Sequence, residues 1–171
     1  MTTEWGALAG VFPFDEVLRD YLYQRADMFA ARGDDKPRYS REDVDRWFAE
    51  RLTPDADAYY AKELYLDLSK VTPHVSGPGG VKKMTPVPDM EEQKVKVDKA
   101  YLLSCVNARL EDLTAAAEVL GGRKVADHVD FYVAAASASV EKEAKKGGVW
   151  QKLVEAGAHT LPPGCGPCIG M

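Results

Sequence analysis

The stretch KAYLLSCVNARLEDLTAAAEVL (residues 99–120) decides the fold that we predict for this chain. Its first part, Lys99 to Ser104, is a short run rich in apolar residues, which is typical of a strand. Its last part, Arg109 to Leu120, has apolar residues at helical spacing and is followed by Gly121-Gly122, a frequent helix end. We therefore expect a strand, a turn that carries Cys105, and a helix.

The residues downstream extend this pattern. A second apolar strand is expected from His128 to Ala136, followed by two short helices, Ser139 to Lys146 and Val149 to Ala156. Strands that alternate with helices predict an α/β fold with a parallel sheet and right-handed crossovers. Ligands of such sheets bind in the loops after the carboxyl ends of the strands, which is where Cys105 is placed.

The residues upstream indicate a mainly helical segment. The apolar spacing predicts one helix from Phe14 to Ala31, and Ser40 is the expected N-cap of a second helix that ends before Pro54. Alternating polar and apolar residues predict a strand from Glu63 to Ser69. From Val71 to Gln93, many Pro and Gly residues predict a long loop without regular structure.

These patterns divide the chain into three parts. Residues 1–70 are expected to form a partial helical or α/β segment, and residues 71–94 a loop rich in Pro and Gly. Residues 95–171 are expected to form the α/β domain.

The composition excludes several classes of function. The chain has 46% apolar and 29% charged residues with a net charge of -5, and it lacks the basic stripe that a nucleic-acid partner needs. No apolar run is long enough to span a membrane, and we see no secretion signal. The odd count of three cysteines argues against a closed disulfide framework.

The other two cysteines, Cys165 and Cys168, lie in a loop rich in Pro and Gly, where two thiolates three residues apart can bind one metal centre. Thiol–disulfide exchange is one alternative for Cys-Gly-Pro-Cys, although that motif usually begins a helix early in a fold. A structural zinc ion with His159 or His128 as fourth ligand, and an iron–sulfur cluster with one iron free of protein ligands, are equally compatible with the spacing. Three unrelated buried cysteines are a further alternative.

One acidic residue near the start is a candidate for proton transfer. Glu4 lies beside Trp5 and just before the apolar stretch Gly6 to Gly10. Desolvation in such a setting raises the pKa of a carboxyl group, which suits it to acid–base chemistry.

At the cysteines the sequence resembles a known family. Leu103-Ser-Cys-Val-Asn-Ala-Arg-Leu-Glu-Asp-Leu113 resembles the first cluster-cysteine motif of the aconitase family, and Cys165-Gly-Pro-Cys-Ile-Gly170 is similar to the second. Glu4 to Asp15 and Leu68 to Pro78 resemble two further segments of the family. The resemblance covers nearly the whole chain.

The resemblance implies a three-layer aconitase-type α/β domain with a parallel sheet, preceded by a helical segment of the adjoining domain. It also implies a hydro-lyase whose 4Fe-4S cluster is bound by Cys105, Cys165 and Cys168. Glu4 would act as a catalytic residue that hydrogen-bonds near the hydroxyl of a small tricarboxylic-acid substrate. Trp5 and the sequence around Cys105 point to members of the family that act on homocitrate or homoaconitate in lysine biosynthesis. Aconitase or 3-isopropylmalate dehydratase chemistry is the alternative.

The sequence also departs from the family pattern. Val106 replaces the usual threonine after the first cysteine, and the family's other catalytic segments lie outside these residues. We therefore expect part of a longer mitochondrial enzyme that is inactive alone and needs the remaining domains in cis or in trans. A non-catalytic metal or iron–sulfur module is the second hypothesis.

Overall fold

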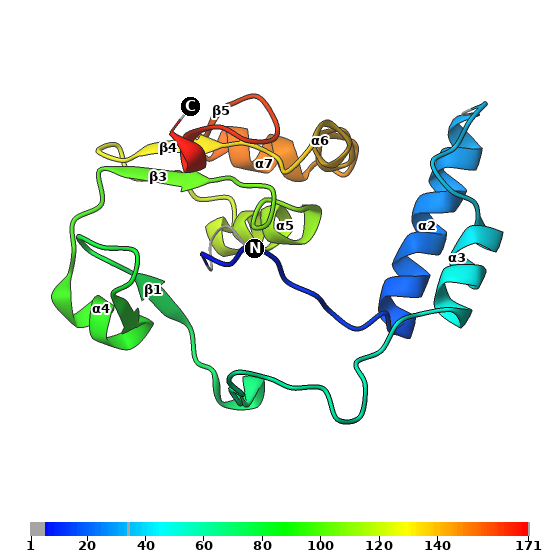
Figure 1. Ribbon diagram of the computed structural model, residues 1–171. Helices are drawn as coiled ribbons and strands as arrows, with labels where there is room; N and C mark the ends of the chain where they lie inside the picture. The colour runs from blue at the N-terminus through cyan, green and yellow to red at the C-terminus, as the bar shows by residue number, and fades with distance from the viewer. Residues whose placement is uncertain (1–5, 34, 171) are drawn as a thin grey trace. The chain divides into compact units, whose positions relative to one another are not determined.

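The computed structural model describes residues 6–33 and 35–170. The chain divides into two compact units, with the boundary between Asp67 and Leu68. Each unit has its own elements (Figure 1). Among the described residues, every helix is too short or too polar to cross a membrane.

The first unit is built on two helices, as the apolar spacing predicts. Helix α2 (Glu16–Arg32) begins at Asp15, whose carboxylate accepts the Leu18 N–H at 2.9 Å, and it ends at Gly33 in the left-handed conformation. Helix α3 (Arg41–Ala49) begins at Ser40, which forms a capping box with Asp43. This helix ends five residues before Pro54, so its C-terminus is earlier than expected.

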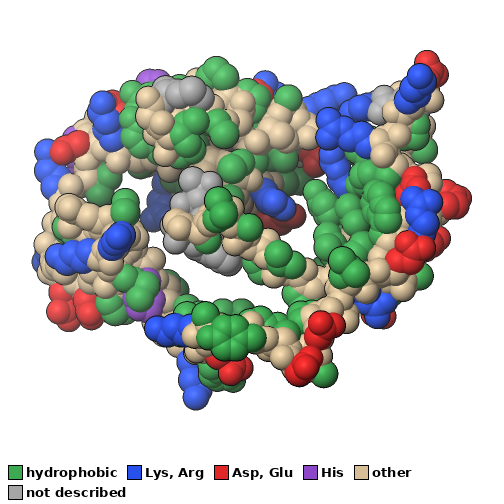
Figure 2. All heavy atoms as spheres, in the orientation of Figure 1, with side chains coloured by type: hydrophobic (Ala, Val, Ile, Leu, Met, Phe, Trp, Pro, Cys, Tyr) green, Lys and Arg blue, Asp and Glu red, His purple; other side chains and the backbone are tan. Residues whose placement is uncertain are grey.

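Aromatic and charged side chains hold α2 against α3. Tyr39 packs edge-to-face on Phe29 and at a tilt against Trp47. The guanidinium of Arg41 on α3 donates two hydrogen bonds to Asp27 on α2, at 2.6 and 2.7 Å. Figure 2 shows acidic and basic side chains mixed with exposed apolar ones over these helices.

The prediction of a strand from Glu63 to Ser69 is wrong. Those residues form an irregular segment followed by a short 3-10 helix, η1 (Leu68–Lys70). Leu64 and Tyr65 are 82% and 92% exposed. An alternating pattern produces a strand only where a neighbouring strand and a covering layer are available, and no described residue provides them here.

The segment predicted to lack regular structure contains some. Strands β1 (His74–Ser76) and β2 (Met84–Pro86) form a two-stranded antiparallel sheet, and helix α4 (Val87–Gln93) follows directly. Pro86 and Pro88 lie at the start of this helix, where the missing N–H groups are tolerated. The Pro and Gly residues of this segment therefore mark the ends of short strands and a short helix.

The second unit also contains a parallel sheet of three strands in chain order: β3 (Lys99–Leu102), β4 (Asp130–Val133) and β5 (His159–Thr160). The expected strands are present but shorter, and β5 was not expected. Helix α5 (Leu110–Leu120) connects β3 to β4. Helices α6 (Ala138–Lys146) and α7 (Val149–Glu155) connect β4 to β5. The α/β class with a parallel sheet is thus confirmed.

The three helices pack on one face of this sheet. Both crossovers run in the same direction along the sheet, and right-handed crossovers of that kind place their helices on the same side. One core cluster accordingly joins side chains from β4 and all three helices: Leu113, Ala117, Phe131, Val133, Ala144, Trp150 and Leu153. Within the second unit, the opposite face of the sheet carries Tyr101, Tyr132 and His159, whose rings form a row.

Candidate functional site

Cys105 lies in the turn that joins β3 to α5, as the sequence predicts. Its side chain is exposed, while Ala108 in the same turn is fully buried. The turn ends where the Asp112 carboxylate accepts the Arg109 N–H at 3.0 Å and thereby starts α5. The thiol is therefore held on an ordered backbone at the carboxyl end of the sheet.

Cys165 and Cys168 lie in the loop that follows β5. The Leu161 N–H donates to the Val133 carbonyl at 2.8 Å, and the Gly164 N–H donates to the Ala135 carbonyl at 2.9 Å. A short 3-10 helix, η2 (Pro167–Ile169), contains Cys168. Both thiols are exposed.

The two cysteine-bearing loops are attached to the same stretch of chain. Directly after β4, the Ala136 N–H donates to the Ala108 carbonyl of the Cys105 turn at 2.8 Å. The neighbouring Ala135 carbonyl accepts the Gly164 N–H, one residue before Cys165. Adjacent residues of one extension thus hold both loops at the same edge of the sheet, because parallel strands end there together.

The structure also bears on the alternatives for these cysteines. All three are exposed, which contradicts the hypothesis of three buried cysteines. Cys165 and Cys168 belong to a turn and a 3-10 helix, whereas the redox motif requires the start of an α-helix.

The zinc alternative needs its ligands to meet at one point. In residues 6–33 and 35–170, no group of three or more His, Cys, Asp or Glu side chains has that arrangement. His128 precedes β4 and so lies at the opposite edge of the sheet from Cys105, and the ring of His159 packs at 5.2 Å from that of Tyr132. The three thiolates themselves are soft donors of the kind that both zinc and iron–sulfur centres accept.

Glu4, the predicted catalytic residue, lies outside the described residues.

Sequence reasoning missed two features of the site. The stretch from Ala134 to Ala136, which connects the two loops, shows only small apolar residues in the sequence and carries no local signal. The other feature is the hydroxyl of Ser104, which accepts the N–H groups of Val106 and Asn107. It could have been noticed, because serine often caps a turn with its own hydroxyl group.

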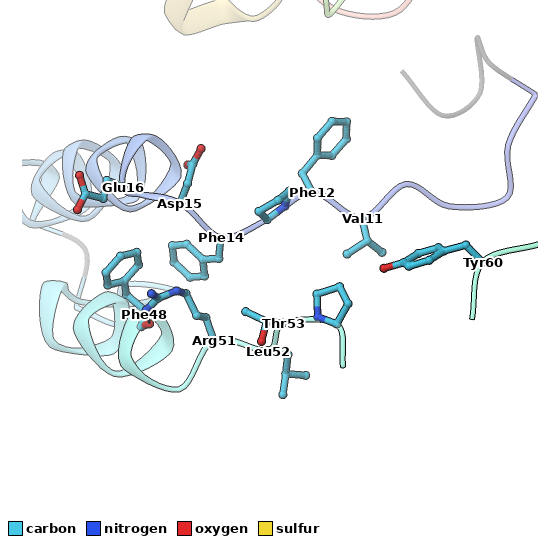
Figure 3. A pocket seen from close by; sticks show the side chains of 12 residues that line it. Val11, Phe12, Phe14, Asp15, Glu16, Phe48, Arg51, Leu52, Thr53 and Tyr60 are labelled. Carbon is cyan, nitrogen blue, oxygen red and sulfur yellow. Dashed lines mark hydrogen bonds between the residues drawn. The ribbon is translucent and has the colours of Figure 1, made fainter. Parts of the chain in front are cut away.

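A separate pocket of about 600 Å³ lies in the first unit, between the segment before α2 and the end of α3 (Figure 3). Phe14 packs edge-to-face on Phe48, and the Arg51 guanidinium lies 4.3 Å from the centre of the Phe48 ring. Asp15 at the rim already caps α2. Asp15 and Arg51 are thus engaged in local structure, and none of the three cysteines lines this pocket.

Comparisons with known proteins identify the family. The family model described as "Aconitase family (aconitate hydratase)" matches residues 1–171. The chain is 47% identical over 171 residues to a protein named "Homoaconitase, mitochondrial" from Candida albicans and 51% identical over 175 residues to its namesake from Eremothecium gossypii. A third, from Emericella nidulans, is 49% identical over 187 residues.

Each alignment covers 100% of this chain and 24% or 25% of the relative. The chain therefore spans about a quarter of the length of the curated relatives that it matches. Because the family model covers every residue, the chain belongs to the aconitase family.

Proposed function

We propose that this chain is the cluster-holding part of a 4Fe-4S hydro-lyase, with Cys105, Cys165 and Cys168 as the cluster ligands. The observation that carries the proposal is the attachment of both cysteine loops to Ala135 and Ala136. Three exposed thiols on two ordered loops supply soft sulfur donors, which favour iron–sulfur centres. The fourth iron is then left without a protein ligand.

The chemistry divides between the cluster and the chain. When bound, the cluster supplies a Lewis acid at the iron that has no protein ligand. The chain holds the three thiolates on backbone that is hydrogen-bonded to the sheet, which keeps the donor geometry fixed. Following the family resemblance, we assign Glu4 the role of hydrogen-bonding near the substrate hydroxyl.

We propose homoaconitate hydration in lysine biosynthesis as the reaction of the whole protein. The relatives reported above are named homoaconitase and mitochondrial, at 47–51% identity. The substrate is then a small tricarboxylic acid, and the location is the mitochondrion. Because the chain spans about a quarter of those relatives, we expect turnover only with the remaining domains, supplied in cis or in trans.

The experiment that tests the cluster proposal is anaerobic reconstitution of the chain with ferrous iron and sulfide. Iron counting and electron paramagnetic resonance should show a three- or four-iron centre in the wild type and its loss in Cys105→Ser. Val106→Thr is a matched control, because it changes the neighbouring side chain at nearly constant volume and leaves all three thiols. A folded wild-type chain that takes up no cluster would show that the ligand assignment is wrong.

A further inference from the structure

The residue just before Cys105 has an unusual backbone conformation. Ser104 has a φ of 113°, and Lys94 is the other non-glycine residue with positive φ in the described part of the chain. Side chains other than glycine rarely adopt this conformation, because the Cβ crowds the backbone. A strained residue of this kind persists where its surroundings determine it, and such residues gather at functional sites.

The hydroxyl group of Ser104 organises the turn that follows. Its Oγ accepts the N–H of Asn107 at 2.8 Å and the N–H of Val106 at 3.2 Å. The Arg109 N–H donates to the Asp112 carboxylate, and the Ala108 carbonyl accepts the N–H of Ala136. The backbone around Cys105 is thus fixed by one hydroxyl, one carboxylate and one backbone hydrogen bond from Ala136.

The positive φ of Ser104 and the hydrogen bonds of its hydroxyl group both act on Cys105. The positive φ turns the chain sharply as it leaves β3, and this turn sets the direction in which the next residue, Cys105, leaves the backbone. The two hydrogen bonds keep the following peptides from relaxing that turn. Any change in the hydroxyl group therefore reaches the thiol through the backbone.

We propose that Ser104 is a positioning residue that orients the Cys105 thiolate toward the iron–sulfur cluster without binding iron itself. This inference rests on the proposed function, because it assumes that Cys105 is a cluster ligand. A purely structural role for Ser104 would instead stabilise the connection between β3 and α5, whatever the thiol does.

Three substitutions separate the conformation from the hydrogen bonds. Ser104→Gly removes the acceptor and also relieves the crowding at positive φ, whereas Ser104→Ala removes the acceptor and keeps the Cβ. Ser104→Asn keeps an acceptor oxygen in the side chain, because the asparagine amide oxygen can also cap a turn. Thr114→Val is the matched control, since it removes a hydroxyl that bonds the Leu110 carbonyl within α5 of the same unit.

Each variant is reconstituted with ferrous iron and sulfide and examined by electron paramagnetic resonance. Amide hydrogen exchange at Val106 and Asn107, together with the thermal midpoint, is measured on the chain before reconstitution. We expect Ser104→Gly and Ser104→Ala to weaken cluster binding by roughly 5- to 100-fold, the equivalent of two lost hydrogen bonds. Ser104→Asn should restore the signal, and Thr114→Val should keep the wild-type spectrum.

The outcomes separate the two proposals. If Ser104→Gly binds the cluster as the wild type does and gives the same spectrum, the positioning role is wrong and the cluster proposal stands. If exchange at Val106 and Asn107 is unchanged in Ser104→Gly, the hydroxyl does not hold the turn, and the inference is overturned. A wild-type chain that takes up no cluster overturns the ligand assignment and this inference with it.

Discussion

Replacing Gly164 by alanine tests whether the loop that carries Cys165 depends on its present backbone conformation. Gly164 has a φ of +104°, and its N–H donates to the Ala135 carbonyl at 2.9 Å. A Cβ built at this position meets no atom within 4 Å outside its chain neighbours. The effect of the substitution is therefore conformational and involves no steric clash with the rest of the unit.

Two limiting cases bracket the free energy that the Gly164→Ala substitution is expected to cost. If the loop keeps its conformation, a non-glycine residue at this φ costs about 1–3 kcal/mol. If the loop relaxes, it loses the hydrogen bond to Ala135, which contributes about 1 kcal/mol. The cluster needs the loop in its original place, so we expect iron–sulfur binding to weaken between about 5-fold and about 100-fold.

The assay is an anaerobic titration with ferrous iron and sulfide, accompanied by a thermal unfolding curve. Gly147→Ala is the matched control, because Gly147 has an ordinary helical φ of -81° at the end of α6. Its new Cβ would lie 3.5 Å from the Glu143 carbonyl oxygen, an ordinary contact. Equal cluster binding by Gly164→Ala and Gly147→Ala would refute the reasoning about the loop.

Three further predictions concern stability. Leu153→Ala should lower the free energy of unfolding of the second unit by about 2–5 kcal/mol in urea titrations, because Leu153 is fully buried in its core. A stability unchanged by this truncation would contradict the assigned core. Gly148→Ala should lower the free energy of unfolding by about 1–2 kcal/mol, because Gly148 has a φ of +75°. Gly147→Ala should leave the free energy of unfolding unchanged, because Gly147 has an ordinary helical φ. Equal urea midpoints for the two variants would contradict this prediction. The hydrogen bonds from Arg41 lower the pKa of Asp27 below its ordinary value of 3.8. The ion pair between Asp27 and Arg41 therefore stabilises α2 and α3 at pH values above 3.8, and this stabilisation is lost as the pH falls below 3.8. Asp27→Asn should flatten the acid part of the curve of helicity against pH, measured by circular dichroism.

Local chemistry explains which parts of the fold were predictable. Ser40 satisfies an unpaired N–H group three residues away, so the start of α3 was recognised without knowledge of the rest of the chain. Asp15 does the same for α2, although the helix was expected to begin at Phe14. The placement of Cys105 after a parallel strand follows in the same way, since it depends only on the order of adjacent elements.

Elements that depend on distant partners were predicted poorly. The segment Glu63 to Ser69 has the alternation of a strand, yet it has no described partner and remains irregular. Strand β5 is two residues long and gives no periodic signal, and it forms because Tyr132 and Val133 offer it a neighbouring edge. Strand pairing is a long-range event that a local pattern cannot specify.

The sequence by itself determined the α/β class, the N-cap of α3 and the three candidate thiols, because each of these depends on residues that are neighbours in the chain. The tertiary structure alone decided that both cysteine loops attach to Ala135 and Ala136, and that Ser104 holds the Cys105 turn at a positive φ. The physical reason is that backbone N–H and carbonyl groups make these attachments. Every residue except proline carries the same pair of groups, so their partners are selected by the folded chain and not by the side chains that a sequence displays.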